Sequence, residues 1–112
     1  MNKFNAQQIT IDGIKFHSKK EGNRYEELKL LQRAGAITDL QRQVKFEIVP
    51  KCRQLDGSMS MAKYYIADFT YKERGMFIVE DVKGYKKGAA GELYELKRAL
   101  MLWIHGIQIK ET

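Results

Sequence analysis

The chain of 112 residues contains one cysteine, one proline and two histidines. A lone Cys52, in a polar segment without an adjacent histidine, excludes an internal disulfide and indicates an inert thiol in a reducing cytoplasm. His17 and His105 have no partner at the spacing of zinc ligands. No apolar run approaches the length of a membrane span, and residues 1–5 contain no signal-peptide core. These absences predict a cytoplasmic protein without a disulfide, a zinc site or a membrane segment.

The chain is rich in charge, and the charge is unbalanced. It has 20 Lys and Arg against 14 Asp and Glu, for a net charge of +6. A basic chain favours polyanionic partners because counterions are released at phosphates. The glycine-rich segment 84–91 lacks a Gly-Lys-Ser/Thr ending, so we expect no nucleotide cofactor.

Local signals divide the first half of the chain. Residues 1–7 are expected to be flexible, and residues 8–112 to form a single domain. Asp-Gly at 12–13 predicts a tight hairpin over residues 9–16. Ser18-Lys19-Lys20-Glu21 matches the capping box of a helix that Gly35 would end.

The second half predicts mostly strands. We expect a strand over 43–49, a polar and mobile loop over 51–62, and a hairpin of two apolar strands over 64–83. A helix over 92–105 and a short strand over 107–110 follow. The inward face of this helix should consist of Leu93, Leu96, Leu100 and Trp103.

This order of elements predicts an α/β (α+β) domain. Two helices would flank a mixed sheet in the order αβββαβ, with a short hairpin at the N-terminus. The last strand is expected to lie parallel to the preceding one, as a right-handed crossover requires.

Two acids occupy unusual places in the apolar hairpin. Asp68 interrupts an alternating strand, and Asp81 ends the next strand, two residues before Lys83. A turn at Arg74-Gly75, or a four-residue loop over 73–76, places Asp68 opposite Asp81. Facing carboxylates are destabilising unless a cation lies between them. Mg²⁺ takes oxygen ligands from one or two carboxylates and keeps several waters.

Glu80 competes with Asp81 for this role. Side chains alternate along a strand, so Asp81 and Lys83 share a face while Glu80 points away from it. Asp81 is therefore the preferred metal ligand.

The element order, Asp68, and the triplet Asp81-Val82-Lys83 together resemble the PD-(D/E)xK nuclease superfamily. Within it, the chain is most similar to the Holliday-junction-resolvase-like branch and to a small uncharacterised phage-encoded group. Further similar phrases are residues 12–21, Ala67-Asp68-Phe69 and the run from Val79 to Gly84. Ala67 stands where the family usually has proline. The resemblance implies a restriction-endonuclease-like core.

The resemblance also implies a catalytic site. Asp68 and Asp81 would bind Mg²⁺, for which Mn²⁺ would substitute, and the backbone carbonyl of Val82 would be a further ligand. Lys83 would orient the attacking water or stabilise the transition state. A glutamate on the first helix completes the site in such members, and Glu21 matches it.

Glu21 has a second explanation, because a glutamate three residues after Ser18 is what a capping box prescribes. Both roles are compatible. Glu26 and Glu27 are alternatives for the third acid, although they fit a solvated helix face.

Basic and polar residues around the acids are candidates for DNA contacts. Gln43 and Lys97 match positions of the resolvase-like pattern near the site, but they equally fit a polar strand end and a solvated helix face. The phosphate-binding candidates are Lys51, Arg53, Lys86 and Lys87.

The sequence thus predicts a Mg²⁺-dependent endonuclease acting on DNA, branched or in Holliday junctions. The resemblance implies a homodimer in the cytoplasm, which is the host cytoplasm if the gene belongs to a phage. An inactive basic DNA-binding accessory module of the same fold is the alternative, and composition also leaves an RNA-directed nuclease open.

Overall fold

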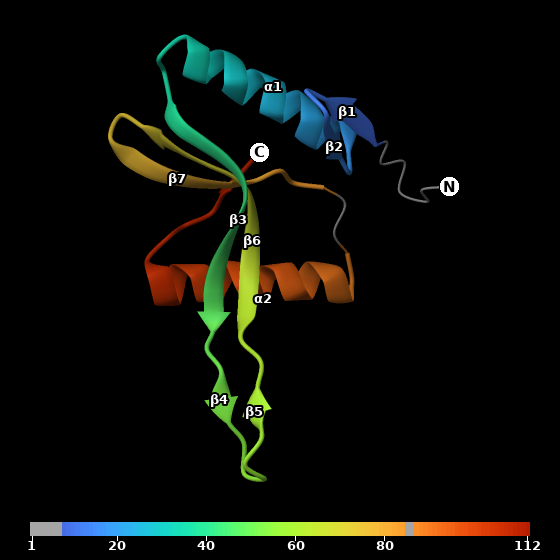
Figure 1. Ribbon diagram of the computed structural model, residues 1–112, viewed down its shortest axis with the longest axis vertical. Helices are drawn as coiled ribbons and strands as arrows, with labels where there is room; N and C mark the ends of the chain where they lie inside the picture. The colour runs from blue at the N-terminus through green and yellow to red at the C-terminus, as the bar shows by residue number, and fades with distance from the viewer. Residues whose placement is uncertain (1–7, 85–86) are drawn as a thin grey trace.

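The computed structural model describes residues 8–84 and 87–112. The predicted flexible segment 1–7 and the candidate Lys86 lie outside the described residues. The elements are β1 (Ile9–Ile11), β2 (Ile14–Phe16), α1 (Lys19–Arg33), β3 (Thr38–Val49), β4 (Cys52–Arg53), β5 (Met59–Ser60), β6 (Lys63–Glu73), β7 (Met76–Asp81), α2 (Ala89–His105) and β8 (Lys110–Glu111). This is the predicted mixed α/β architecture, with an additional pair of short strands, β4 and β5 (Figure 1).

The N-terminal hairpin and α1 follow their local signals. Asp12 and Gly13 both have positive φ, at 54° and 76°, which is the conformation of a two-residue turn between antiparallel strands. The Ser18 side chain accepts the N–H of Glu21 at 3.1 Å and caps α1. Gly35 follows the helix with a φ of 83°, as a helix-ending glycine does.

The main sheet has four strands in the order β3-β6-β7-β8. The predicted register of the central hairpin is confirmed: β6 and β7 pair antiparallel from Phe69 with Glu80 to Glu73 with Met76, around Arg74-Gly75. β8 pairs parallel to β7, also as predicted, although it covers Lys110–Glu111 and not 107–110.

Residues 51–62 do not form the predicted loop. β4 and β5 pair antiparallel and make a narrow arm that projects away from both helices (Figure 1). At its tip, Gly57 N–H donates to the Gln54 carbonyl, and the Asp56 carboxylate accepts from the Ser58 N–H and hydroxyl. The arm could not be predicted from the sequence because this segment has few strand-favouring side chains. Local turn hydrogen bonds and the long β3–β6 hairpin at its base support the arm.

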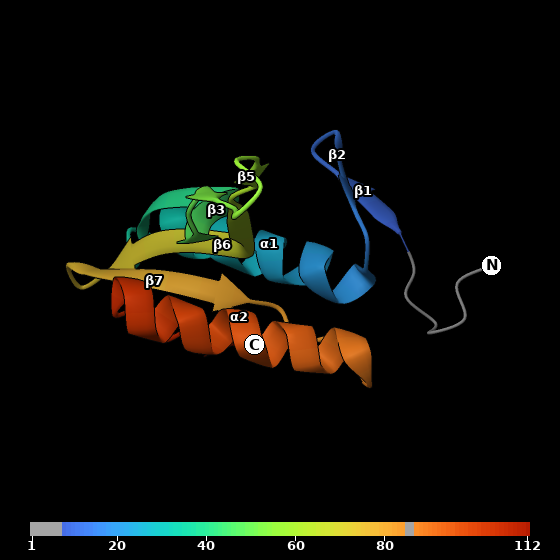
Figure 2. The same ribbon diagram turned by 90° about the horizontal axis from the view of Figure 1, so that it is seen from below.

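Two apolar clusters lie against the two helices. Tyr25 and Leu28 of α1 belong to the first, and Met101 of α2 to the second. β7 separates them, because Ile78 packs on the first cluster and Val79 belongs to the second. Figure 2 shows α2 running along one side of β7. No helix in the described part of the chain is long and apolar enough to cross a bilayer.

The inward face predicted for α2 is wrong for three of its four residues. Leu93 and Leu96 are exposed, and Trp103, expected in the core, is 82% exposed. The helix instead buries Met101 and partly buries Tyr94, while Leu100 packs at the edge of the second cluster. The sheet therefore contacts the stripe of α2 that contains Tyr94 and Met101. The more hydrophobic stripe, which contains Leu93, Leu96 and Trp103, faces outward.

Candidate functional site

The site begins at a distortion shared by β3 and β6. Arg42 pairs with Phe69 and Val44 with Ala67, so Gln43 lies opposite Asp68. Gln43 has a φ of 52°, which a residue with a side chain rarely adopts. Side chains of β6 before this point, Tyr65 and Ala67, pack on the α2 side, and those after it, Phe69 and Tyr71, on the α1 side. Because alternate side chains of a regular strand share one face, the strand pair must bend or twist strongly at Gln43 and Asp68.

Asp68 and Asp81 meet where the β6–β7 pairing ends. The last backbone pair is Phe69 with Glu80, so the two aspartates are the next residues on their strands. One Asp68 carboxylate oxygen accepts the Val82 N–H at 2.8 Å. The structure thus brings together Asp68, Asp81 and Val82, as predicted.

Asp81 lies in a small cavity beneath α2. The residue is 5% exposed, and its carboxylate accepts the Tyr65 hydroxyl at 3.1 Å. Burial and the Asp81 charge raise the pKa of the Tyr65 phenol, so the hydroxyl remains a donor at neutral pH. Lys97, a predicted site residue, lines the same cavity of about 270 Å³ together with Tyr94.

Glu21 reaches the site from the first turn of α1. The residue is only 9% exposed, and Gln43 donates to its carboxylate at 3.3 Å. Burial raises the pKa of Glu21; the charges of Arg42 and His17 oppose this effect, and the charge of Asp81 adds to it. The Glu21 carboxylate thus faces Gln43 and is electrostatically coupled to Asp81, while only its N–H takes part in the cap.

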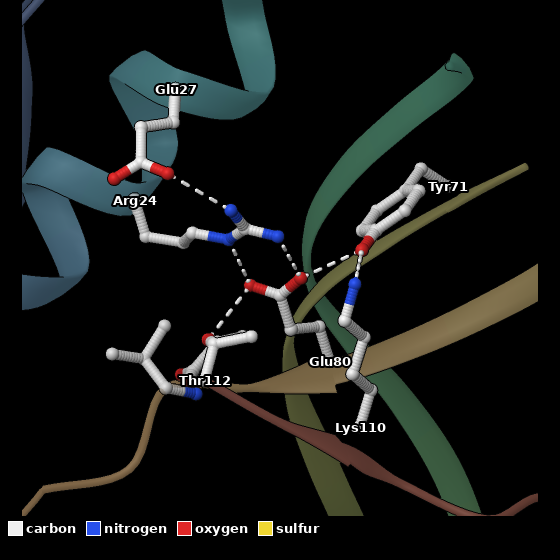
Figure 3. A network of polar contacts seen from close by, with 8 residues as sticks. Arg24, Glu27, Tyr71, Glu80, Lys110 and Thr112 are labelled. Atoms are coloured by element: carbon white, nitrogen blue, oxygen red, sulfur yellow. Dashed lines mark hydrogen bonds and ion pairs between the residues drawn. The ribbon is translucent and has the colours of Figure 1, made fainter. Parts of the chain in front are cut away.

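Glu80 is held in an ion pair on the other side of β7. It is completely buried, and Arg24 of α1 donates to its two oxygens at 2.7 and 2.9 Å. Tyr71 at 2.7 Å and Thr112 at 3.0 Å complete the four hydrogen bonds (Figure 3). Burial alone would raise the pKa of Glu80, but these donors hold it below its ordinary value. A carboxylate with four donors has no acceptor position left for a metal, so Glu80 is no rival to Asp81.

Lys83 lies just beyond the end of β7, with an exposed side chain and a fixed backbone. Its N–H donates to the Thr112 carbonyl at 2.7 Å, and its carbonyl accepts the Lys20 ammonium at 2.7 Å. The side chain lines an open cavity of about 610 Å³ beside the N-terminus of α2. Lys87 and Arg98 also line this cavity, together with the acids Glu92, Glu95 and Glu111, and Arg98 is paired with Glu95 and Glu111.

A family model described as "Protein of unknown function (DUF1064)" matches residues 1–105. The chain belongs to the DUF1064 family. No curated protein and no solved structure matches the chain.

In this DUF1064 protein, two of the candidate phosphate contacts lie far from the acids. Arg53 pairs with Met59 in the arm, and Met59 precedes Asp68 by nine residues along the β5–β6 segment. At roughly 3.3 Å per residue, Arg53 lies up to about 30 Å from Asp68. Lys51 is at the base of the same arm. These two residues therefore lie at or in the arm, outside the β6–β7 hairpin that carries the acids.

The donor set of the DUF1064 site suits a hard cation bound by few protein groups. Its side-chain oxygens are those of Asp68 and Asp81, and the Val82 carbonyl is the further ligand that the resemblance implies. Across residues 8–84 and 87–112, no three His, Cys, Asp or Glu side chains are arranged to hold a metal ion. Two carboxylates completed by water are nevertheless a usual set for Mg²⁺. Glu21 belongs to the outer part of the site in this arrangement, through Gln43 and its coupling to Asp81.

Several contacts of the DUF1064 site escaped the sequence analysis. In the sequence, Tyr65 is only part of an apolar strand, although its hydroxyl donates to Asp81. Arg42, which lies over the Phe16 ring and whose charge opposes the rise in the pKa of Glu21, carries no local signal of its role. Lys20, whose ammonium donates to the Lys83 carbonyl, is in the sequence only part of the capping box. Such contacts join residues distant in sequence, and only the alternation of β3 and β6 hinted at which faces would meet.

Proposed function

We propose that this DUF1064 protein is a divalent-metal-dependent endonuclease that hydrolyses phosphodiester bonds in DNA, with branched or Holliday-junction DNA as its substrate. The resemblance to PD-(D/E)xK nucleases suggested this function, and with it a restriction-endonuclease-like core. The observation that carries the proposal is the meeting of Asp68 and Asp81 at Val82, directly before Lys83.

Each residue of the site has a chemical role in this proposal. Asp68, Asp81 and the Val82 carbonyl would hold Mg²⁺ or Mn²⁺, which when bound acidifies water and neutralises phosphate charge. Tyr65 orients the Asp81 carboxylate by donating to one of its oxygens. Lys83, exposed at the cavity wall, contacts a phosphate oxygen or the attacking water. Gln43 holds Glu21 beside them, where it completes the acidic site.

The basic residues divide into two proposed DNA contacts. Lys87, with Lys97 behind the aspartates and the neighbouring Lys86, would bind phosphates next to the scissile bond. Lys51 and Arg53 would bind a phosphate group up to about 30 Å away, close to one turn of B-DNA. A duplex arm of a branched substrate that runs along the β3–β6 hairpin meets both groups.

A basic accessory module that binds DNA without cutting it is the second candidate. It is favoured by one observation, namely that the described residues contain no group of three metal-binding side chains. This candidate predicts salt-sensitive DNA binding that is indifferent to Mg²⁺.

The test is cleavage of branched DNA with Mg²⁺ and with EDTA, using Asp81→Asn and Lys83→Ala. We expect at least a 100-fold loss of rate in each variant and no cleavage with EDTA. Asp39→Asn and Lys72→Ala are the matched controls, because this exposed ion pair joins β3 and β6 at the end of their hairpin that is opposite to the arm. Equal rates in Asp81→Asn and the wild type would refute the enzyme and leave the accessory module. Substituting RNA at the same salt concentration decides between the two nucleic acids.

We also propose that the protein acts as a homodimer in the cytoplasm. The outward apolar stripe of α2 offers a surface for a second copy. Cys52 is exposed and unpaired, which fits a reducing compartment.

A further inference from the structure

A network of buried and partly buried polar side chains surrounds Glu80 on the face of β7 opposite Asp81 (Figure 3). Arg24 binds both carboxylate oxygens in a forked arrangement, and Tyr71 and Thr112 each donate to one of them. The Lys110 ammonium in turn donates to the Tyr71 hydroxyl at 3.3 Å. The network therefore joins α1, β6, β7 and the C-terminal segment.

The two charged partners lie next to the acids of the site in sequence. Glu80 directly precedes Asp81 on β7, and its side chain occupies the opposite face. Arg24 follows Glu21 by three residues, which is about one turn of α1. The Arg24–Glu80 pair thus fixes α1 against β7 one turn from the point where Glu21 approaches Asp81.

Thr112, the last residue of the sequence, binds the end of β7 from the other side. Thr112 N–H donates to the Asp81 carbonyl at 3.0 Å, and its carbonyl accepts the Lys83 N–H at 2.7 Å. Its hydroxyl donates to Glu80. The backbone on both sides of Val82 is therefore held by one residue that also belongs to the network.

Stability does not explain this arrangement well. Removing a buried carboxylate and a guanidinium from water costs several kcal/mol per ion, and apolar residues of similar size are often equally or more stabilising. What an apolar pair cannot provide is a fixed mutual orientation, because the forked pair between Arg24 and Glu80 defines both a distance and an angle. The network is therefore better suited to orienting two elements than to stabilising them.

We propose that Arg24 and Glu80 are positioning residues, which hold α1 on β7 so that Glu21 faces the Asp68–Asp81 pair. The inference rests on the proposed function for the role of these acids, and on the contacts alone for their placement. The Arg24 and Glu80 side chains bond to each other, and Glu80 also to Tyr71 and Thr112, on the face of β7 opposite Asp81. Arg24 and Glu80 act through Glu21, Asp81 and the backbone of Lys83.

The test replaces the pair by apolar residues of similar size, in the double variant Arg24→Met with Glu80→Leu. In the metal-free protein, NMR should show that the nuclear Overhauser contacts between the Gln43 side-chain amide and the Glu21 side chain are lost. The dissociation constant for Mn²⁺, measured by calorimetry, should rise at least tenfold. Far-UV circular dichroism and a cooperative unfolding transition should remain.

Lys29→Met is the matched control, because it breaks another ion pair of α1, with Asp12, and leaves the contacts with β7 intact. It should keep both the Gln43–Glu21 contacts and the Mn²⁺ affinity. Glu80→Gln preserves the side-chain shape and provides a second variant if the double variant does not fold.

Unchanged Gln43–Glu21 contacts in a folded Arg24/Glu80 double variant, or in Glu80→Gln if only that variant folds, would overturn the positioning role, whatever the metal affinity. A wild-type protein that binds no Mn²⁺ would instead overturn the proposed function. The contacts measured without metal would still decide the positioning role in that case.

Discussion

Glu21 has two separate structural roles, one for its backbone and one for its side chain. Its N–H is needed for the cap on Ser18, whereas its carboxylate is buried close to Asp81. Burial raises the pKa of the carboxyl, so the folded state binds the proton more tightly than the unfolded chain does. The stability associated with the protonated form is complete below the unfolded pKa of about 4.3 and is lost as the pH rises through the folded pKa.

We therefore predict that Glu21→Gln is more stable than the wild type at pH 7, by a few degrees in the unfolding temperature. The variant keeps the cap and an oxygen that accepts from Gln43, but it carries no buried charge. Below pH 4 the difference should disappear, because the wild-type carboxyl is then protonated in both states. Thermal unfolding at several pH values measures this effect.

Glu26→Gln is the control on the same helix, since Glu26 is exposed, and it should show no such pH dependence. If the site is catalytic, Glu21→Gln should also reduce DNA cleavage while raising stability, the usual trade-off at functional sites. A wild type more stable than Glu21→Gln at pH 7 would show that the buried charge is well compensated, contrary to this argument.

At the scale of elements, the arm of β4 and β5 makes a separable contribution. It is exposed and projects from the end of the β3–β6 hairpin, away from the helices (Figure 1). The double variant Lys51→Glu with Arg53→Glu should weaken DNA binding at least tenfold. It should also reduce the slope of log affinity against log salt by about two, because two phosphate contacts are lost.

The matched control for the arm is Lys72→Glu with Arg74→Glu. It makes the same change of charge at the β6–β7 turn, where both residues are exposed. Fluorescence anisotropy with a labelled junction at several salt concentrations compares the two variants without requiring cleavage. An equal loss in both would mean that net charge alone, and not the arm, determines the affinity.

Elements with local signals could be predicted from the sequence, and those that depend on tertiary contacts could not. The Asp12-Gly13 and Arg74-Gly75 turns specified two hairpins and with them the register that brings Asp68 to Asp81. The bend at Gln43 has no such signal, because nothing in the local sequence shows that this glutamine adopts a positive φ. Alternation favoured Asp81 over Glu80, but the reason, Arg24, lies 56 residues away.

α2 shows how a correct element can be given the wrong face. Hydrophobicity favours the stripe of Leu93, Leu96 and Trp103, and a prediction for a monomer assigns the most apolar stripe to the core. In the structure that stripe is exposed, and the sheet contacts Tyr94 and Met101. A sequence encodes contacts with partners as well as with its own core, and hydrophobicity alone cannot separate the two.

At the scale of the whole molecule, the outward stripe of α2 is the surface that a homodimer would use. Contiguous exposed apolar side chains are unusual on a monomer and mark interfaces. Leu93, Leu96 and Trp103 follow one another at helical spacing, and Leu102 and Ile104, on the same helix, are also exposed. A two-fold axis beside α2 would pack this stripe against its own copy, because an isologous interface is self-complementary.

The last prediction concerns this assembly. Light scattering coupled to size exclusion should give the wild type twice the chain mass of 13.1 kDa. The double variant Leu96→Glu with Trp103→Glu should give a monomer with an unchanged circular dichroism spectrum, because both side chains are exposed in the folded chain. Leu55→Glu, at the tip of the arm, is the control for adding charge at an exposed apolar residue and should remain dimeric. The monomeric variant should nick a junction on one strand without the paired second cut, since each copy holds one site. A wild type that is monomeric at tens of micromolar would leave the apolar stripe to a different partner and would remove the homodimer from the proposed function.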